Sequence, residues 1–87
     1  MKKALILMAS LFALTSVNAE TECTKEPKDK WKKEEAFKKE LEATYKIKVF
    51  KVTKGNCFEI YGWNKEKKKV EIYFNPVTGE IVKEKIE

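Results

Sequence analysis

The stretch that decides the fold is Glu71-Ile-Tyr-Phe-Asn-Pro-Val-Thr-Gly-Glu-Ile-Val82, near the end of the chain. Apolar and polar residues alternate up to Asn75 and again after Gly79, which is typical of two strands joined by a short loop. Pro76 has no N–H to donate to a neighbouring strand, and Gly79 tolerates a positive φ, so a turn is favoured between them. The stretch therefore predicts a β-hairpin whose last strand covers Glu80–Ile86.

Two further strands are predicted before this hairpin. Ile47–Thr53 is β-branched and partly alternating, and Gly55-Asn56 supplies a short turn after it. Cys57–Trp63 alternates next, and a charged loop over Asn64–Lys68 separates it from Val70–Phe74. Because strand side chains alternate between two faces, each of these segments has one face for a core.

A helical period precedes the strands, over Lys33–Tyr45. Phe37, Leu41 and Tyr45 recur at every fourth position on one face, and Trp31 should fold back over the first helical turn. Packing the apolar helix face on one sheet face buries both, so the predicted fold class is α+β. One N-terminal helix packs on a three- to four-stranded antiparallel sheet. The predicted core consists of Phe37, Leu41, Phe58, Ile60, Ile72 and Phe74.

The start of the chain has the pattern of a secretory signal peptide. Lys2-Lys3 is followed by the apolar run Ala4–Ala13 and by small residues at Val17-Asn18-Ala19. The run is shorter than the roughly 20 residues that cross a bilayer, and an uncleaved anchor is the alternative. We predict a signal peptide over residues 1–19, a periplasmic or secreted protein, and no stable membrane insertion after cleavage.

Cys23 and Cys57 are the two cysteines of the chain. Export favours a disulfide, and two cysteines allow one intramolecular pairing. The bridge would tie an N-terminal arm, residues 20–32, to the domain formed by residues 33–87. By the chain-entropy model it contributes roughly 3–4 kcal/mol. The alternatives are a reactive thiol and an intermolecular bridge.

The composition argues against catalysis. Beyond Ala19 the chain contains no His, Ser, Met, Arg or Gln, and Asp29 is its single Asp. A Ser or Cys nucleophile needs a base, most often His, and haem, copper and zinc sites use His, Met or free Cys. Paired glutamates such as Glu34-Glu35 are typical of a solvated helix surface. We predict no enzyme activity, no catalytic residue, no cofactor and no metal site.

The charge does not point to nucleic acid. The formal charge is +5, and without Lys2 and Lys3 the 19 basic residues become 17 against 14 acidic ones, or +3. Lysines and glutamates are interleaved, as on a solvated face, and the one basic run, Lys65–Lys69, is interrupted by Glu66. Nucleic-acid binders cluster basic residues and favour Arg. No nucleic-acid partner is predicted.

Taken in order, several features resemble the PepSY domain superfamily, and especially its small stand-alone periplasmic branch with peptidase propeptide and YpeB-type domains. These features are Cys23, Trp31, Glu34, Glu35, Tyr45, Cys57, Phe58, Glu59 and the closing Tyr73–Val82. The chain departs from the family pattern at Thr44, where Gly is frequent, and over Asn64–Lys69, where an Asp-Gly turn is frequent. The resemblance implies a helix on an antiparallel sheet and a binding or inhibitory role. Related domains occur in propeptides of secreted metallopeptidases, and others accompany membrane redox proteins.

We therefore expect a non-catalytic exported protein-interaction domain that regulates or inhibits a secreted or periplasmic peptidase. The alternatives are an accessory subunit of a membrane electron-transfer or sensory protein, and a small-ligand or metal carrier. The candidate partner surface is Tyr61, Trp63 and Tyr73, which alternation places on the sheet face away from the helix. Alternatively, the N-terminal arm, Trp31 and lysine stems cover these aromatics, or the face forms a homodimer.

Overall fold

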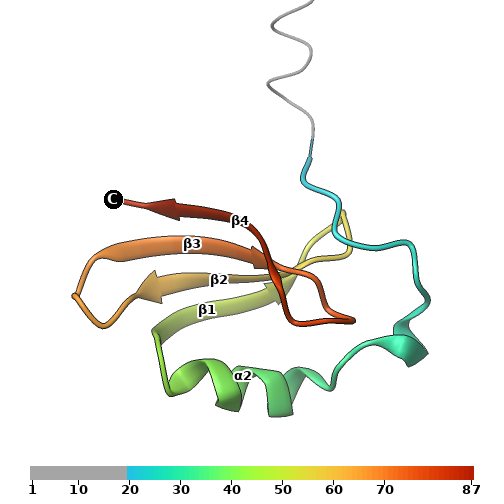
Figure 1. The fold of residues 1–87 in the computed structure, drawn as a ribbon, viewed down its shortest axis with the longest axis horizontal. Helices are drawn as coiled ribbons and strands as arrows, with labels where there is room; N and C mark the ends of the chain where they lie inside the picture. Colours follow the sequence, from blue (N-terminus) through green and yellow to red (C-terminus); the bar gives the residue numbers. More distant parts are fainter. Residues whose placement is uncertain (1–19) are drawn as a thin grey trace, which may run out of the picture.

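A computed structural model describes residues 20–87, so the predicted signal peptide lies outside the described residues. The elements in chain order are a 3₁₀ turn η1 (Lys28–Lys30), a helix α2 (Glu34–Glu42) and the strands β1 (Lys46–Val52), β2 (Phe58–Trp63), β3 (Lys69–Phe74) and β4 (Ile81–Ile86). The strands form one antiparallel sheet in the order β1-β2-β3-β4. Helix α2 lies along one face of this sheet, on the β1 side (Figure 1). The predicted fold class is confirmed.

The hairpin between β3 and β4 has the predicted turn chemistry. The Asn75 side-chain oxygen accepts a hydrogen bond from the Val77 N–H at 2.8 Å. Gly79 adopts a φ of +83°, and its N–H donates to the Asn75 carbonyl at 2.7 Å. Strand β4 begins at Ile81, one residue later than predicted, because the Glu80 carbonyl still closes the turn by accepting from the Asn75 N–H at 2.8 Å.

The loop between β2 and β3 is organised by Asn64. Its side-chain oxygen accepts hydrogen bonds from the N–H groups of Glu66 at 2.9 Å and Lys68 at 3.0 Å. Lys67 takes the left-handed conformation, with a φ of 66°. An Asn side chain that bonds its own backbone a few residues on can replace the more usual Asp-Gly turn. The departure from the PepSY pattern therefore leaves the hairpin intact.

Helix α2 is shorter than the predicted Lys33–Tyr45. Lys33 precedes it with extended backbone, at a ψ of 133°, and provides no side-chain cap. At the other end the N–H groups of Thr44 and Tyr45 both donate to the Leu41 carbonyl, at 2.9 and 2.8 Å. This closes the helix and leads the chain into β1. Periodicity locates the apolar face of a helix but not these end contacts.

Every predicted core residue is buried. The core contains Phe37, Leu41, Phe58, Ile60, Val70, Ile72 and Phe74. Phe58 lies among three other aromatic rings, with centroid distances of 5.6 Å to Trp31, 5.7 Å to Phe37 and 5.3 Å to Phe50. The Trp31 ring meets Phe58 edge-on, so this residue belongs to the helix side of the sheet.

The N-terminal arm is fastened to the β1–β2 turn. The predicted disulfide Cys23–Cys57 is present, with a Cα–Cα distance of 5.1 Å, and it accounts for both cysteines. The Cys23 N–H also donates to the Gly55 carbonyl at 3.0 Å, and the Asn75 side-chain amide donates to the Cys23 carbonyl at 3.1 Å. A Cβ on Gly55 would lie 1.9 Å from the Thr21 carbonyl oxygen, so only glycine allows this close approach.

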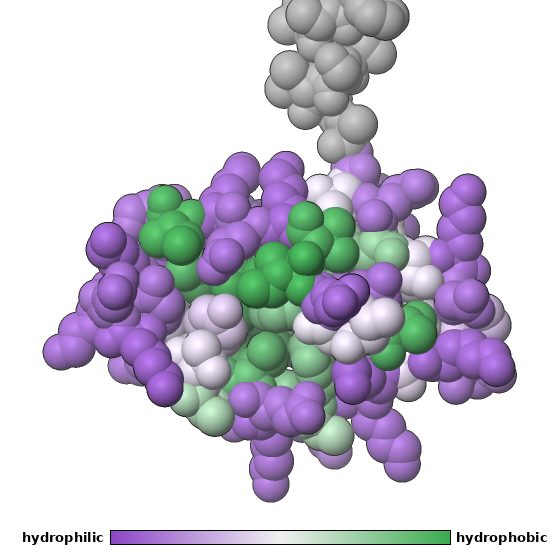
Figure 2. All heavy atoms as spheres, in the orientation of Figure 1, coloured by the Kyte–Doolittle hydropathy of each residue, from purple (hydrophilic) through white to green (hydrophobic). Residues whose placement is uncertain are grey.

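Strand β4 forms an exposed edge of the sheet. All its residues are exposed, including Ile81, Val82 and Ile86, each close to half accessible. Figure 2 shows hydrophobic surface along this edge, interrupted by hydrophilic side chains. The charged residues Lys83–Lys85 lie within the strand, and such charges oppose pairing with a further strand.

Candidate functional site

The sheet face turned away from α2, which we call the outer face, carries three rows of side chains. The first row contains Lys46, Trp63 and Lys69, the second Val49, Tyr61, Glu71 and Lys85, and the third Lys51, Glu59, Tyr73 and Lys83. The predicted partner residues Tyr61, Trp63 and Tyr73 therefore lie on one face, each in a different row. Their role in binding stays a prediction.

The two central strands carry the same tripeptide, Glu59-Ile-Tyr61 on β2 and Glu71-Ile-Tyr73 on β3. In the antiparallel register Glu59 lies opposite Tyr73, and Tyr61 lies opposite Glu71. Two carboxyl groups and two phenols thus meet at the centre of the outer face. From the sequence, the tyrosines were identified as candidates, but the two glutamates were not identified as a pair. The repeated tripeptide was a signal in the sequence from which this pair could have been predicted.

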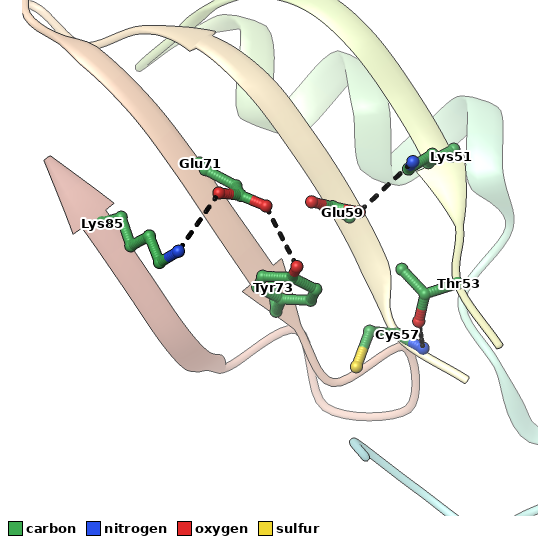
Figure 3. A network of polar contacts seen from close by, with 7 residues as sticks. All are labelled: Lys51, Thr53, Cys57, Glu59, Glu71, Tyr73 and Lys85. Carbon is green, nitrogen blue, oxygen red and sulfur yellow. Dashed lines mark hydrogen bonds and ion pairs between the residues drawn. The ribbon is translucent and has the colours of Figure 1, made fainter. Parts of the chain in front are cut away.

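Polar contacts at this centre join the strands in two pairs, β1 with β2 and β3 with β4 (Figure 3). The Tyr73 hydroxyl donates to Glu71 Oε2 at 3.0 Å. Lys85 Nζ lies 3.9 Å from Glu71 Oε1, and Lys51 Nζ lies 3.8 Å from Glu59 Oε1. Both lysines are exposed, so each ion pair contributes about 0–1 kcal/mol.

Glu59 is a buried carboxyl group, 2% exposed. Within residues 20–87 its Oε2 atom is buried and receives no hydrogen bond from a donor group. Burial is the main cause that raises the pKa of Glu59, and interaction with the nearby Glu71 carboxyl raises this pKa further, while the same interaction lowers the pKa of Glu71. The raised pKa of Glu59 and the lowered pKa of Glu71 mean that, of these two carboxyl groups, Glu59 binds a proton more readily.

The two tyrosines act as donors in the same cluster. Hydrogen bonding to Glu71 is the main cause that raises the pKa of Tyr61 to about 12. Burial, followed by hydrogen bonding to Glu71, raises the pKa of Tyr73 above its ordinary value. Both phenols are thus protonated at neutral pH, and the Tyr73 hydroxyl donates to Glu71.

Lysine stems partly cover the three aromatic rings of the outer face. The Nζ-to-centroid distances are 5.9 Å for Lys46 over Trp63, 5.6 Å for Lys51 over Tyr61 and 5.9 Å for Lys83 over Tyr73. Tyr61 is still 38% exposed. Lysine side chains therefore cover the outer-face aromatics in part, as one alternative from the sequence expected, and they leave part of the aromatic surface open.

The N-terminal arm reaches only one end of the outer face. There Glu20 and Thr21, together with Glu59 and Tyr73, line a cavity of about 280 Å³. The suggestion that Trp31 helps to cover the outer-face aromatics is wrong, because its ring packs against Phe58 on the opposite face. The period of a strand indicates its faces, whereas the path of an irregular arm depends on contacts distant in sequence.

The outer face offers groups suited to binding. It presents phenol donors, a carboxyl pair, lysine ammonium groups and an indole ring. Within the part of the chain that the structure describes, no three His, Cys, Asp or Glu side chains are grouped so that they could hold a metal ion. The helix in that part is too short to cross a bilayer. A disulfide is typical of the oxidising environments outside the cytoplasm.

Comparison with known families places the chain in one of them. The family model described as "Peptidase propeptide and YPEB domain" matches residues 2–85. No curated protein and no solved structure matches the chain significantly. The family match spans nearly the whole chain and confirms the resemblance to PepSY domains found in the sequence.

Proposed function

Because this chain belongs to the family of peptidase propeptide and YPEB domains, we propose that it is a non-catalytic, exported interaction domain that binds and restrains a secreted or periplasmic peptidase. The family match is the observation that carries this proposal, since the family is described by its place in peptidase propeptides. The chemistry of the outer face supports a binding role. Its donors, carboxyl pair and aromatic rings are groups that recognise another protein surface.

The rigidity of the outer face also supports the proposal. The disulfide Cys23–Cys57 fastens one end of this face, and two ion pairs on it join β1 to β2 and β3 to β4. A surface ordered before binding loses less conformational entropy when a partner docks. Such a domain suits an inhibitor that must hold one shape against an enzyme.

The test uses residues 20–87 with the disulfide formed. The immobilised protein is exposed to the periplasmic and secreted fractions of its source, and bound proteins are identified by mass spectrometry. We expect a peptidase among them, and we expect its cleavage of a fluorogenic peptide to fall as the free domain is added up to one equivalent. If no captured peptidase loses activity at saturating domain, the proposal is wrong. Capture of a membrane redox or sensor protein alone would instead favour the accessory-subunit alternative.

A paired set of variants locates the contact. Tyr61→Ser combined with Trp63→Ser removes two outer-face aromatics and leaves the core residues unchanged. Lys38→Ser combined with Lys39→Ser changes two exposed positions on α2 and serves as the matched control. We expect the first pair to weaken capture of the peptidase and the second pair to leave it unchanged. Equal capture by both folded variants would show that the outer face is not the binding surface.

A further inference from the structure

One end of the outer face collects lysines from segments that are separate in the sequence. The six exposed lysines are Lys46, Lys48, Lys65, Lys67, Lys68 and Lys69, and we call the surface they form with Trp63 the basic end. The nearby acidic residues are Glu42, Glu66, Glu71 and Glu87. Six lysines against four glutamates leave an excess of two positive charges at the basic end. This excess is most of the net charge of +3 that residues 20–87 carry. The tertiary structure thus concentrates a charge that looks evenly interleaved along most of the sequence.

Trp63 lies at the centre of this basic end. In the register of the sheet it has Lys46 directly opposite on β1 and Lys69 directly opposite on β3. The three side chains share the outer face, and Lys46 Nζ lies 5.9 Å from the centre of the Trp63 ring. An indole ring is therefore flanked by cations on both neighbouring strands, at the distance of directly opposed side chains.

A hollow lies on each side of Trp63. On the sheet side, Val49 and Tyr61 help to line a cavity of about 440 Å³, with Lys48 and Lys69 among its other lining residues. Toward the end of α2, Trp63 also borders a second hollow with Lys46 and Lys65. Val49 is 39% exposed, so apolar surface is accessible there. A hollow of this volume is large enough for a bulky side chain of a partner.

The charge of the basic end is not neutralised by ion pairs within the domain. The ion pairs found among residues 20–87 join Lys51 to Glu59 and Lys85 to Glu71, and neither involves a lysine of the basic end. Glu71 is further engaged by the Tyr73 hydroxyl. The six ammonium groups are free to meet carboxylates from outside, and a cluster of one sign also accelerates the approach of an oppositely charged partner.

We propose that the basic end binds an acidic segment of a protein partner, with one aromatic or large aliphatic side chain in the hollow beside Trp63 and carboxylates on the flanking lysines. This inference rests on the proposed function in taking the partner to be a protein, and it specifies the chemistry of that partner. The open, partly apolar hollow favours a peptide over an anionic membrane, which would need no hollow. Like charge argues against a second copy of the chain, because two basic ends would repel each other.

The test uses residues 20–87 and the blocked peptide acetyl-Glu-Glu-Phe-Glu-Glu-amide as the probe. Two control peptides replace Phe by Gly, or all four Glu by Gln. The indole N–H signals in an NMR titration report the site, because Trp63 lies on the outer face and Trp31 on the helix side, where its Nε1–H donates to the Glu26 carbonyl at 3.0 Å. We expect the Trp63 signal to shift with the probe and the Trp31 signal to stay in place. We expect both control peptides to bind more weakly.

Charge variants complete the test. Lys46→Ser combined with Lys69→Ser should weaken binding of the probe by about three- to tenfold at low salt, the effect of losing two exposed charge contacts. The matched pair Lys38→Ser with Lys39→Ser should bind like the parent, and added salt should weaken the parent more than the basic-end variant.

Several results would overturn this inference. They are an unshifted Trp63 signal at millimolar probe, equal binding of the Gly or Gln peptide, equal effects of the two lysine pairs, and binding of phosphatidylglycerol vesicles without binding of the peptide. None of these measurements involves a peptidase. If the peptide titration fails, the capture and inhibition assays still test the proposed function. If those assays fail, the result of the peptide titration is still valid.

Discussion

The two faces of the sheet are built from different interactions. On the helix side, Phe37, Phe58 and Phe74 pack with aliphatic residues of the core, and the interior is apolar throughout. On the outer face, the buried Glu59 lies between charged and phenolic side chains in a partly open surface. The helix side therefore supplies most of the stability through burial of apolar area, whereas the outer face supplies groups that a partner can bind.

This difference shows how a small domain can be stable and still keep one sheet face polar. The core needs only one sheet face and one helix, because their apolar stripes bury each other. The outer face is then free to carry polar groups, and its cross-strand contacts and disulfide hold them in place. Five variants test this division between the faces.

The largest effect is expected for Phe58→Ala. This residue is fully buried among three aromatic rings, so its truncation should lower the free energy of unfolding by about 3–5 kcal/mol. Urea denaturation measures the loss. The matched change on the outer face is Tyr61→Ala, which should cost about 1 kcal/mol because the side chain is partly exposed. Equal losses for the two variants would contradict the division between the faces.

Removal of the disulfide should have the next largest effect. Cys23→Ala with Cys57→Ala frees a loop closed over a sequence separation of 34, and we expect a loss of roughly 3–4 kcal/mol by the chain-entropy model. The hydrogen bonds of the arm to Gly55 and Asn75 lack the covalent tie in this variant and should weaken with it. Denaturation of the variant and of the parent with and without reductant measures the effect. An unchanged midpoint would mean that these hydrogen bonds alone hold the arm.

A smaller effect is expected for Tyr73→Phe. The change removes the hydroxyl that donates to Glu71 at 3.0 Å, a hydrogen bond to a charged group, and should cost about 1.5 kcal/mol. Tyr61→Phe serves as the comparison and should cost less, because Tyr61 is more exposed. Thermal unfolding of both variants at pH 7 measures the difference. A larger loss for Tyr61→Phe would contradict the geometry of the cluster.

The smallest effect, below about 1 kcal/mol, is expected for Glu59→Gln, and it depends on pH. The pKa of Glu59 is raised by folding, so its contribution is present below the ordinary Glu pKa and is lost as the pH rises through the raised value. Gln has no ionisable group and avoids this loss. The variant should match the parent near pH 4 and exceed it in stability at pH 7.

Glu71→Gln should change stability with pH in the opposite direction to Glu59→Gln. The pKa of Glu71 is lowered by folding, so its contribution is present above the ordinary Glu pKa and is lost as the pH falls through the lowered value. This variant should be less stable than the parent at pH 7, and the difference should shrink in acid. Urea denaturation at a series of pH values measures both variants. Parallel pH profiles for the two would show that folding does not shift the two pKa values in opposite directions.

Much of the fold was predictable because it depends on local patterns. Alternation in Phe58–Trp63 and Val70–Phe74 placed the core residues correctly, and Asn75 with Gly79 indicated the closing turn. The disulfide followed from a count of two cysteines and an exported chain. The boundaries of α2 were less accurate, because a helix ends where particular N–H and carbonyl groups find other partners.

The sequence by itself determined the order of elements, the two faces of each strand and the single disulfide, since these depend on periodicity, turn residues and composition. Only the tertiary structure decided which side chains meet across strands. The grouping of Glu59 with Glu71, the position of Trp31 on the helix side and the lysines around Trp63 all follow from register and from the path of the arm. A period of two residues defines a face, but the cross-strand neighbour depends on how segments distant in the chain are aligned.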